Sequence, residues 1–135
     1  MAVCKILIVD DDEEIIEMLS EVIQVLDIFD ETPEIDSAID GDLGLYKLVN
    51  KPYDIVFLDY QMPGADGNEV ITRIRNQEGP NQTVPIVLVS GRLTEFVYDL
   101  SDKKYEGVHL IDKPFKTETI SRLIQIWALS KARAS

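Results

Sequence analysis

The stretch that decides the fold is DIVFLDYQMPGADG, residues 54–67. Its first half is a run of apolar residues that predicts a strand over residues 54–58, closed by Asp59. Its second half is a turn-rich loop that contains proline and glycine. Asp66 followed by Glu69 fits a capping box, and apolar residues at positions 70, 71 and 74 form one helix face behind it. The stretch therefore predicts a strand, a polar loop and a helix in succession.

The same order of strand and helix recurs along the chain. Asp11 and Glu14 fit a capping box for a first helix, Gly41 begins a short second one, and Thr117 is a candidate cap for the last. The segment 93–100 predicts only a short helix. Five strand–helix units predict an α/β fold, a doubly wound five-stranded parallel sheet with helices on both faces. The further strands are expected over residues 3–9, 34–38, 84–89 and 108–111.

Length and composition indicate one domain. The chain has 135 residues, 45% hydrophobic and 28% charged, so we expect a single domain over residues 1–135, with a core over about 5–129 and a frayed tail over 130–135. A net charge of −12 disfavours nucleic-acid binding and a polybasic membrane anchor. The apolar runs are too short to span a bilayer and no signal pattern opens the chain, so we expect a cytoplasmic protein. Cys4, the only cysteine, is expected to be a buried, inert thiol.

Polar residues stand at the ends of four expected strands. Right-handed crossovers place the carboxyl ends of parallel strands at one edge of the sheet, where such folds bind ligands. Two like charges about 4 Å apart repel by about 4 kcal/mol at an effective dielectric constant of about 20, so clustered carboxylates require a proton, a lysine or a hard cation. Oxygen ligands with open positions suit Mg²⁺ better than zinc. The strand-end residues are Asp10, Asp11, Asp59, Ser90 and Lys113.

Four segments resemble the receiver domains of two-component response regulators: ILIVDD at residues 6–11, DIVFLDYQMPG at 54–64, PIVLVSG at 85–91 and DKPF at 112–115. Each motif is weak alone, but four in this order and spacing are specific. The resemblance implies a flavodoxin-like (βα)5 fold with strand order 2-1-3-4-5. It also implies a phosphorylatable signalling switch that is not an enzyme in the ordinary sense.

The resemblance assigns roles to the carboxylates. Asp59 would be the phosphoacceptor, and the donor would be a phosphohistidine of a sensor histidine kinase or of a histidine phosphotransfer protein. Asp10, Asp11, Asp59 and the backbone carbonyl of Gln61 would bind Mg²⁺, with Mn²⁺ as a substitute. Positioning and charge neutralisation account for most of the catalysis of phosphoryl transfer, which agrees with this set of groups.

The resemblance also implies a two-state switch. Lys113 would pair first with the acceptor carboxylate and then with a phosphoryl oxygen, and Ser90 would hydrogen-bond to another phosphoryl oxygen. Phosphorylation would repack a face formed by the segment 93–100, the strand 108–111 and the last helix. Nothing in the sequence decides whether this face also forms a homodimer.

Two features depart from the family pattern. The switch aromatic usually lies three positions before the lysine, where this chain has Leu110, and the segment 93–100 is poorly specified as a helix. Gln61 and Arg92 occupy pocket-lining positions that tune dephosphorylation in the family. We expect a structural role for the neighbouring His109 and a core position for Trp127. No output domain is recognisable after Trp127, so the sequence fits a stand-alone receiver or one cut from a larger regulator or hybrid kinase.

Two other functions remain in competition. Phosphatases of the haloacid dehalogenase type use an aspartate pair after their first strand, which Asp10 and Asp12 would supply. Those enzymes also need an acidic pair after the lysine, where this chain has only Glu118. The second alternative is a receiver-like interaction module that is never phosphorylated. Phosphorylation on Asp10, on Asp59 or on neither residue separates the three hypotheses.

Overall fold

A computed structural model gives the fold, and it describes residues 3–26, 29, 31–91 and 101–134. Within these residues the chain alternates between strands and helices, as the sequence predicts. The elements are β1 (Lys5–Val9), α1 (Glu13–Val25), β2 (Glu34–Ala38), α2 (Gly41–Asn50), β3 (Ile55–Asp59), α3 (Gly67–Asn76), β4 (Ile86–Ser90), the short 3-10 helix η2 (Lys103–Tyr105), β5 (Val108–Asp112) and α4 (Thr117–Ala134).

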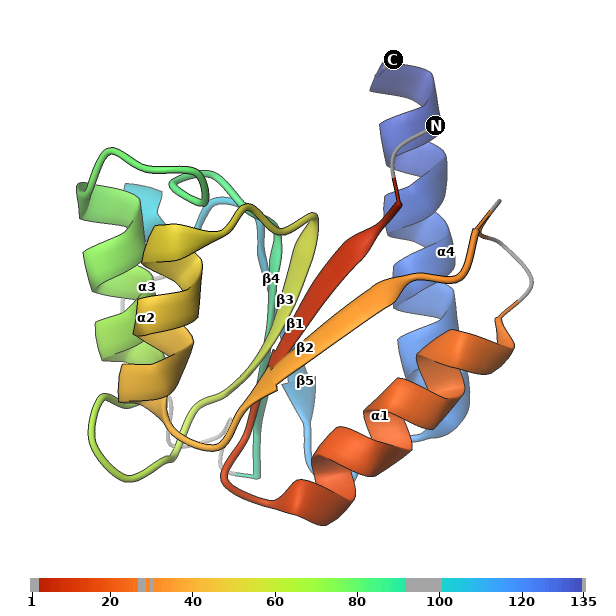
Figure 1. The fold of residues 1–135 in the computed structure, drawn as a ribbon, viewed down its shortest axis with the longest axis horizontal. Coiled ribbons are helices and arrows are strands. Elements are labelled where there is room, and N and C mark those ends of the chain that lie inside the picture. Colours follow the sequence, from red (N-terminus) through yellow and green to blue (C-terminus); the bar gives the residue numbers. More distant parts are fainter. Residues whose placement is uncertain (1–2, 27–28, 30, 92–100, 135) are drawn as a thin grey trace.

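The five strands form one parallel sheet in the order β2-β1-β3-β4-β5. Helices α2 and α3 cover one face of the sheet, and α1 and α4 cover the other (Figure 1). The doubly wound, flavodoxin-like fold and its strand order are therefore confirmed. All strands run the same way, so their carboxyl ends meet at one edge of the sheet.

Alternate residues of each central strand serve two separate cores. In β1, Leu7 and Val9 pack in the cluster beneath α2 and α3, whereas Ile6 and Ile8 pack in the cluster against α1 and α4. All four side chains are at most 1% exposed. A strand buried on both faces needs apolar side chains at every position, which is why the sequence shows continuous apolar runs rather than alternation. Each such side chain contributes about 2 kcal/mol through burial.

Acidic residues cap the helices that follow β1 and β3. Asp66 accepts a hydrogen bond from the backbone N–H of Glu69 at 2.9 Å, which confirms the predicted cap of α3. The prediction of Asp11 as the cap of α1 is wrong. Asp12 is the cap, because its side chain accepts from the N–H of Glu14 at 2.9 Å. Such a cap stabilises a helix by about 1 kcal/mol, and here it leaves the Asp11 carboxylate outside the helix.

Most element boundaries lie within two residues of the sequence prediction. Strands β3 and β4 extend far enough to include Asp59 and Ser90. Helix α4 starts at Thr117 itself and continues to Ala134, so most of the tail that we expected to fray is helical. The segment 93–100 lies outside the described residues, as does its contribution to the expected switch face.

The structure also shows how far three single residues, Trp127, Cys4 and His109, are buried. Trp127 packs against the α1–α4 cluster, as expected for a core residue. Cys4 packs against the same cluster but is only half-buried, and His109 is exposed on β5. No helix in the described part of the chain is both long and apolar enough to cross a membrane.

Helix α2 begins in close contact with the loop that follows β3. A Cβ atom added to Gly41 would lie 1.8 Å from the carbonyl oxygen of Ala65, a distance that no side chain can occupy. Glycine therefore permits the backbone of α2 to touch the loop that connects Asp59 to α3. The contact fixes this loop beside the carboxyl ends of the strands.

Candidate functional site

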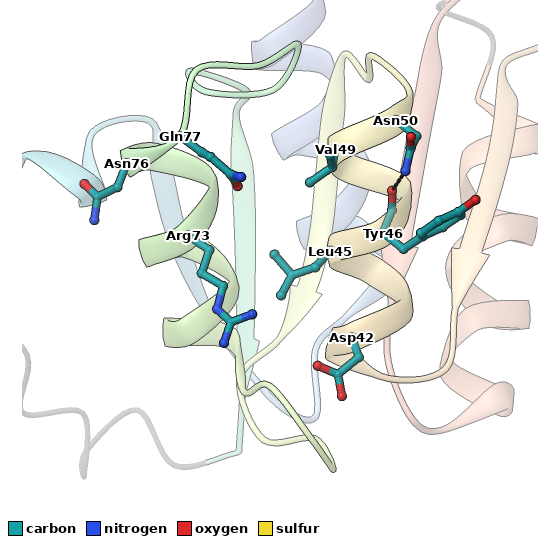
Figure 2. A pocket seen from close by; sticks show the side chains of 8 residues that line it. All are labelled: Asp42, Leu45, Tyr46, Val49, Asn50, Arg73, Asn76 and Gln77. Atoms are coloured by element: carbon teal, nitrogen blue, oxygen red, sulfur yellow. Dashed lines mark hydrogen bonds between the residues drawn. The ribbon is translucent and has the colours of Figure 1, made fainter.

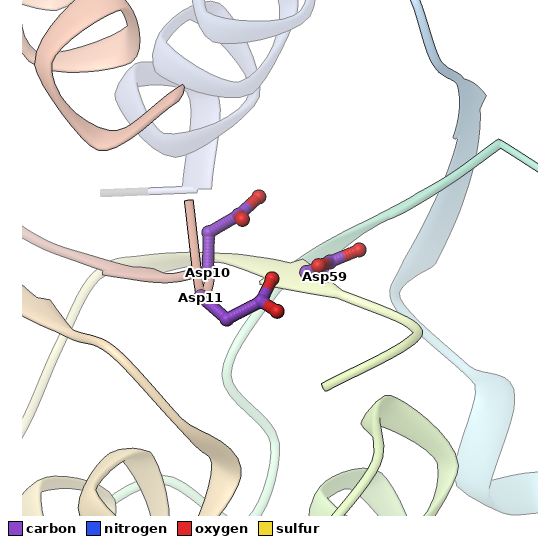
Figure 3. A group of neighbouring side chains, drawn as sticks. All are labelled: Asp10, Asp11 and Asp59. Atoms are coloured by element: carbon purple, nitrogen blue, oxygen red, sulfur yellow. The ribbon is translucent and has the colours of Figure 1, made fainter. Parts of the chain in front are cut away.

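Three carboxylates converge at the carboxyl edge of the sheet. Asp10 follows β1 directly, Asp11 comes next, and Asp59 is the last residue of β3. The pairing of Val9 with Leu58 in the parallel register brings the two strand ends side by side. One oxygen from each carboxylate lies within 4.8 Å of the others (Figure 3). Asp10 and Asp59 are 2% and 5% exposed, whereas Asp11 is open to solvent.

Lys113 neutralises part of this charge from the end of β5. Its Nζ lies 3.1 Å from Asp10 Oδ2 and 3.2 Å from Asp59 Oδ1. The backbone N–H of Lys113 donates to the carbonyl of Ser90 at 2.9 Å, which fixes the lysine beside the end of β4. One ammonium against three carboxylates leaves the site with a net negative charge.

The excess charge perturbs the titration of these groups. Burial, together with the negative charge of Asp10, raises the pKa of Asp59 to about 6, although Lys113 opposes the shift. Burial also raises the pKa of Asp10. Burial by itself would lower the pKa of Lys113, but the carboxylates of Asp59 and Asp10 raise it on balance. The site therefore stabilises an additional positive charge, which can be a proton or a cation.

The donor set fits a hard divalent cation. All three side chains offer oxygen, the ligand atom that hard divalent cations take, and one oxygen from each lies within 4.8 Å of the others. No second cluster of three or more potential metal ligands occurs among the described residues. Asp12 helps to orient the site, because its backbone N–H donates to Asp10 Oδ1 at 2.9 Å.

Comparison with known proteins identifies the family. The response regulator receiver domain family matches residues 6–125, which is most of the chain. The chain belongs to this family. Receiver domains of this family typically interact with histidine kinases or phosphotransfer proteins, which agrees with the expected partner class.

Curated relatives of this receiver domain are response regulators. The response regulator ArlR of Staphylococcus saprophyticus is 31% identical over 117 residues, which cover 86% of this chain and 48% of the relative. The ArlR of Staphylococcus epidermidis is 30% identical over 115 residues, with coverage of 85% and 48%. The receiver chain thus spans about half the length of the curated relatives that it matches.

Solved structures show the same fold. The chemotaxis response regulator CheY4 of Vibrio cholerae has a TM-score of 0.72 and 26% identity, and the match covers 93% of this chain and 99% of that one. A CheY-like receiver domain protein of Methanospirillum hungatei has a TM-score of 0.75 and 20% identity, with coverage of 99% and 100%. The second likeness supports the fold alone.

The structure describes three of the four remaining site candidates of this receiver domain. Ser90 is buried at the end of β4, one strand away from Asp59. Gln61 is exposed in the loop directly after β3. Leu110 is half-buried on β5 and packs against the cluster beneath α2 and α3. Arg92 lies outside the described residues.

Sequence reasoning missed the backbone contacts that hold the loop between Asp59 and α3. The N–H of Tyr60 donates to the carbonyl of Val89 at 2.9 Å, and the N–H of Gly67 donates to the carbonyl of Tyr60 at 2.8 Å. A Cβ atom at Gly67 would lie 2.9 Å from the carbonyl oxygen of Asp59. The only sequence signal for this close approach is a glycine at the first position of a helix, where other residues serve as well.

A groove between α2 and α3 is separate from the carboxylates. It encloses about 520 Å³ and has a wall formed by Leu45, Tyr46 and Val49 (Figure 2). Arg73 and Asp42 also line it, but none of the five strand-end residues does. The groove is therefore distinct from the carboxylate cluster at the carboxyl edge of the sheet.

Proposed function

We propose that this receiver domain accepts a phosphoryl group on Asp59 from a phosphohistidine, in a transfer that depends on Mg²⁺. The donor is a sensor histidine kinase or a histidine phosphotransfer protein. The acyl phosphate on Asp59 then changes a protein-interaction surface of the domain. The domain is thus a signalling switch that assists its own phosphorylation and dephosphorylation.

The main support for this proposal is that one carboxylate oxygen of Asp59 is available to act as the nucleophile. Within the described residues, Asp59 has Lys113 as its partner on Oδ1, which leaves Oδ2 to attack. Asp10 has both oxygens engaged, Oδ1 by the N–H of Asp12 and Oδ2 by Lys113. This difference favours Asp59 over Asp10 as the nucleophile.

In the proposed transfer, a P–O bond to Asp59 forms while the P–N bond to the donor imidazole breaks, and the electron pair of that bond returns to the imidazole nitrogen. Mg²⁺, when bound, would supply charge neutralisation for the transferred group. Lys113 neutralises a second part of that charge from the end of β5. Ser90, at the end of β4, donates a hydrogen bond from its hydroxyl to a third phosphoryl oxygen. Asp10, Asp11 and Asp59 would hold the metal through their side chains, and Gln61 would hold it through its backbone carbonyl.

The test is phosphorylation by acetyl phosphate, followed by intact-protein mass spectrometry. Wild type should gain one phosphoryl group with Mg²⁺ and none with EDTA, and Asp59→Asn should gain none. Borohydride reduction of the acyl phosphate, followed by peptide mapping, locates the modified residue. A label on Asp10 supports the phosphatase alternative instead. If neither acetyl phosphate nor histidine kinases modify the wild-type protein, the domain is an interaction module and the proposal fails.

A further inference from the structure

Helix α3 lies next to the segment that leads into β5, and polar contacts join the two. Near the start of α3, the hydroxyl of Tyr105 donates to Asn68 Oδ1 at 2.5 Å. One turn later, Lys104 Nζ donates to Thr72 Oγ1 at 3.1 Å. Asn68, Thr72 and Arg75 follow one another at spacings of four and three residues, which places them on one stripe of the helix. This stripe faces η2 along the length of α3.

The last turn of α3 makes more hydrogen bonds to the neighbouring segments than the first turn does. Arg75 donates to the carbonyls of Gln82 and Val84 at 3.0 and 2.8 Å, just before β4. It also donates to the carbonyls of Lys104 and Glu106, both at 3.1 Å, around η2. Four hydrogen bonds from one charged group hold this end, and each such bond is stronger than a neutral one. The first turn is connected to η2 through the hydrogen bond between Tyr105 and Asn68.

The first turn of α3 is in direct contact with the acceptor residue. Gly67 donates its N–H to the carbonyl of Tyr60, and its Cα lies too close to the carbonyl oxygen of Asp59 to allow a side chain. Asn68 is the next residue. A displacement of the backbone at Asp59 therefore reaches Asn68 through Gly67, because the close-packed contact between Asp59 and Gly67 leaves no space to absorb it.

These contacts suggest a route that does not need an aromatic ring at position 110. We propose that the hydrogen bond between Tyr105 and Asn68 couples the state of Asp59 to η2 and the start of β5, an inference that rests on the proposed phosphorylation of Asp59. Tyr105 is 6% exposed and belongs to the cluster beneath α2 and α3, and Leu110 packs against the same cluster. Arg75, through its hydrogen bonds to four carbonyls, holds the last turn of α3 in place. A shift at Asp59 therefore changes the hydrogen bond at Asn68, in the first turn, before it changes the contacts of the last turn.

The experiment compares amide hydrogen exchange of residues 103–108 in wild type, Tyr105→Phe and Asn68→Ala, before and after phosphorylation with acetyl phosphate and Mg²⁺. The amides of Tyr105 and Glu106 are the reporters, because they bond to the carbonyls of Asp102 and Lys103. Phosphorylation of wild type should change their exchange rates by about fivefold, the factor that one hydrogen bond is typically worth. Both variants should lose this response while they gain the phosphoryl group to the same extent as wild type.

Tyr53→Phe is the matched control. Tyr53 is also buried, and its hydroxyl donates to Asp36 Oδ2 at 2.7 Å, on the strand farthest from β5. This variant should keep the wild-type response at residues 103–108. An unchanged segment in phosphorylated wild type overturns the coupling, as does a full response in either Tyr105→Phe or Asn68→Ala. Absence of the phosphoryl group from every protein overturns the proposed function as well, and mass spectrometry distinguishes the two failures.

Discussion

Replacing Asp59 by asparagine should stabilise the metal-free protein at neutral pH. The pKa of Asp59 rises from 3.8 to about 6 in the folded state, because burial and Asp10 disfavour its charge. The folded protein thus holds a proton more tightly than the unfolded chain does. The stabilising contribution of the protonated group is complete below about pH 4 and is lost as the pH rises through about 6. Asparagine does not titrate, so Asp59→Asn avoids this loss.

The size of the effect follows from the shift. A change of about two pKa units, at about 1.4 kcal/mol each, corresponds to roughly 3 kcal/mol at pH 8 and to almost nothing at pH 4. Urea unfolding of wild type and Asp59→Asn in EDTA, at pH 4, 6 and 8, measures both values. Mg²⁺ should reduce the difference, since a ligand at 100 times its dissociation constant stabilises the folded wild type by about 2.7 kcal/mol.

The control for this experiment is Glu21→Gln, which removes an exposed carboxylate from α1. It should change the free energy of unfolding by less than about 0.5 kcal/mol at every pH. The reasoning is refuted if Asp59→Asn is no more stable than wild type at pH 8 in EDTA. It is equally refuted if the difference between the two proteins is the same at pH 4 and pH 8.

Three further substitutions test other parts of the structure. Lys113→Met should lower the free energy of unfolding by about 2 kcal/mol in EDTA at pH 8, because two buried carboxylates lose their cation. An unchanged free energy in urea unfolding would contradict this reasoning. Gly41→Ala should cost at least about 3 kcal/mol or prevent folding, because its Cβ would overlap the carbonyl of Ala65, whereas Gly79→Ala, with open space around it, should be nearly neutral in thermal melts. Asn81→Ala should lower the free energy of unfolding by about 3 kcal/mol, since this buried side chain bonds to three backbone groups between residues 48 and 53, and a loss below about 1 kcal/mol in urea titrations would contradict that reasoning.

The fold and the carboxylate cluster could be predicted because both depend on local sequence. A parallel strand buried on both faces is a continuous apolar run, so residues 55–58 and 86–89 are recognisable as strands, and the polar residue that ends each run marks the edge of the sheet. Asp59 and Lys113 could therefore be placed together from the order of strands and strand-end residues alone, and their side chains do form an ion pair.

Other features depend on contacts between distant segments, and the sequence does not encode them locally. The capping-box pattern points to Asp11, but the turn in which the N–H of Asp12 bonds to Asp10 makes Asp12 the cap. Arg75 has the same helical position as many surface arginines, and only tertiary packing brings four carbonyls to it. The exposure of His109 likewise follows from the position of β5 at the edge of the sheet, which the apolar pattern around it does not reveal.

The anchor at Arg75 gives the two edges of the sheet opposite electrical characters. At the amino ends of β4 and β5, one guanidinium is surrounded by backbone dipoles that carry no net charge. At the carboxyl ends, the charges of three aspartates and one lysine do not balance. The unbalanced carboxylates attract cations, whereas the guanidinium is already hydrogen-bonded to four backbone carbonyls. The protein can thus respond to ions at one edge while the other keeps the strands in register.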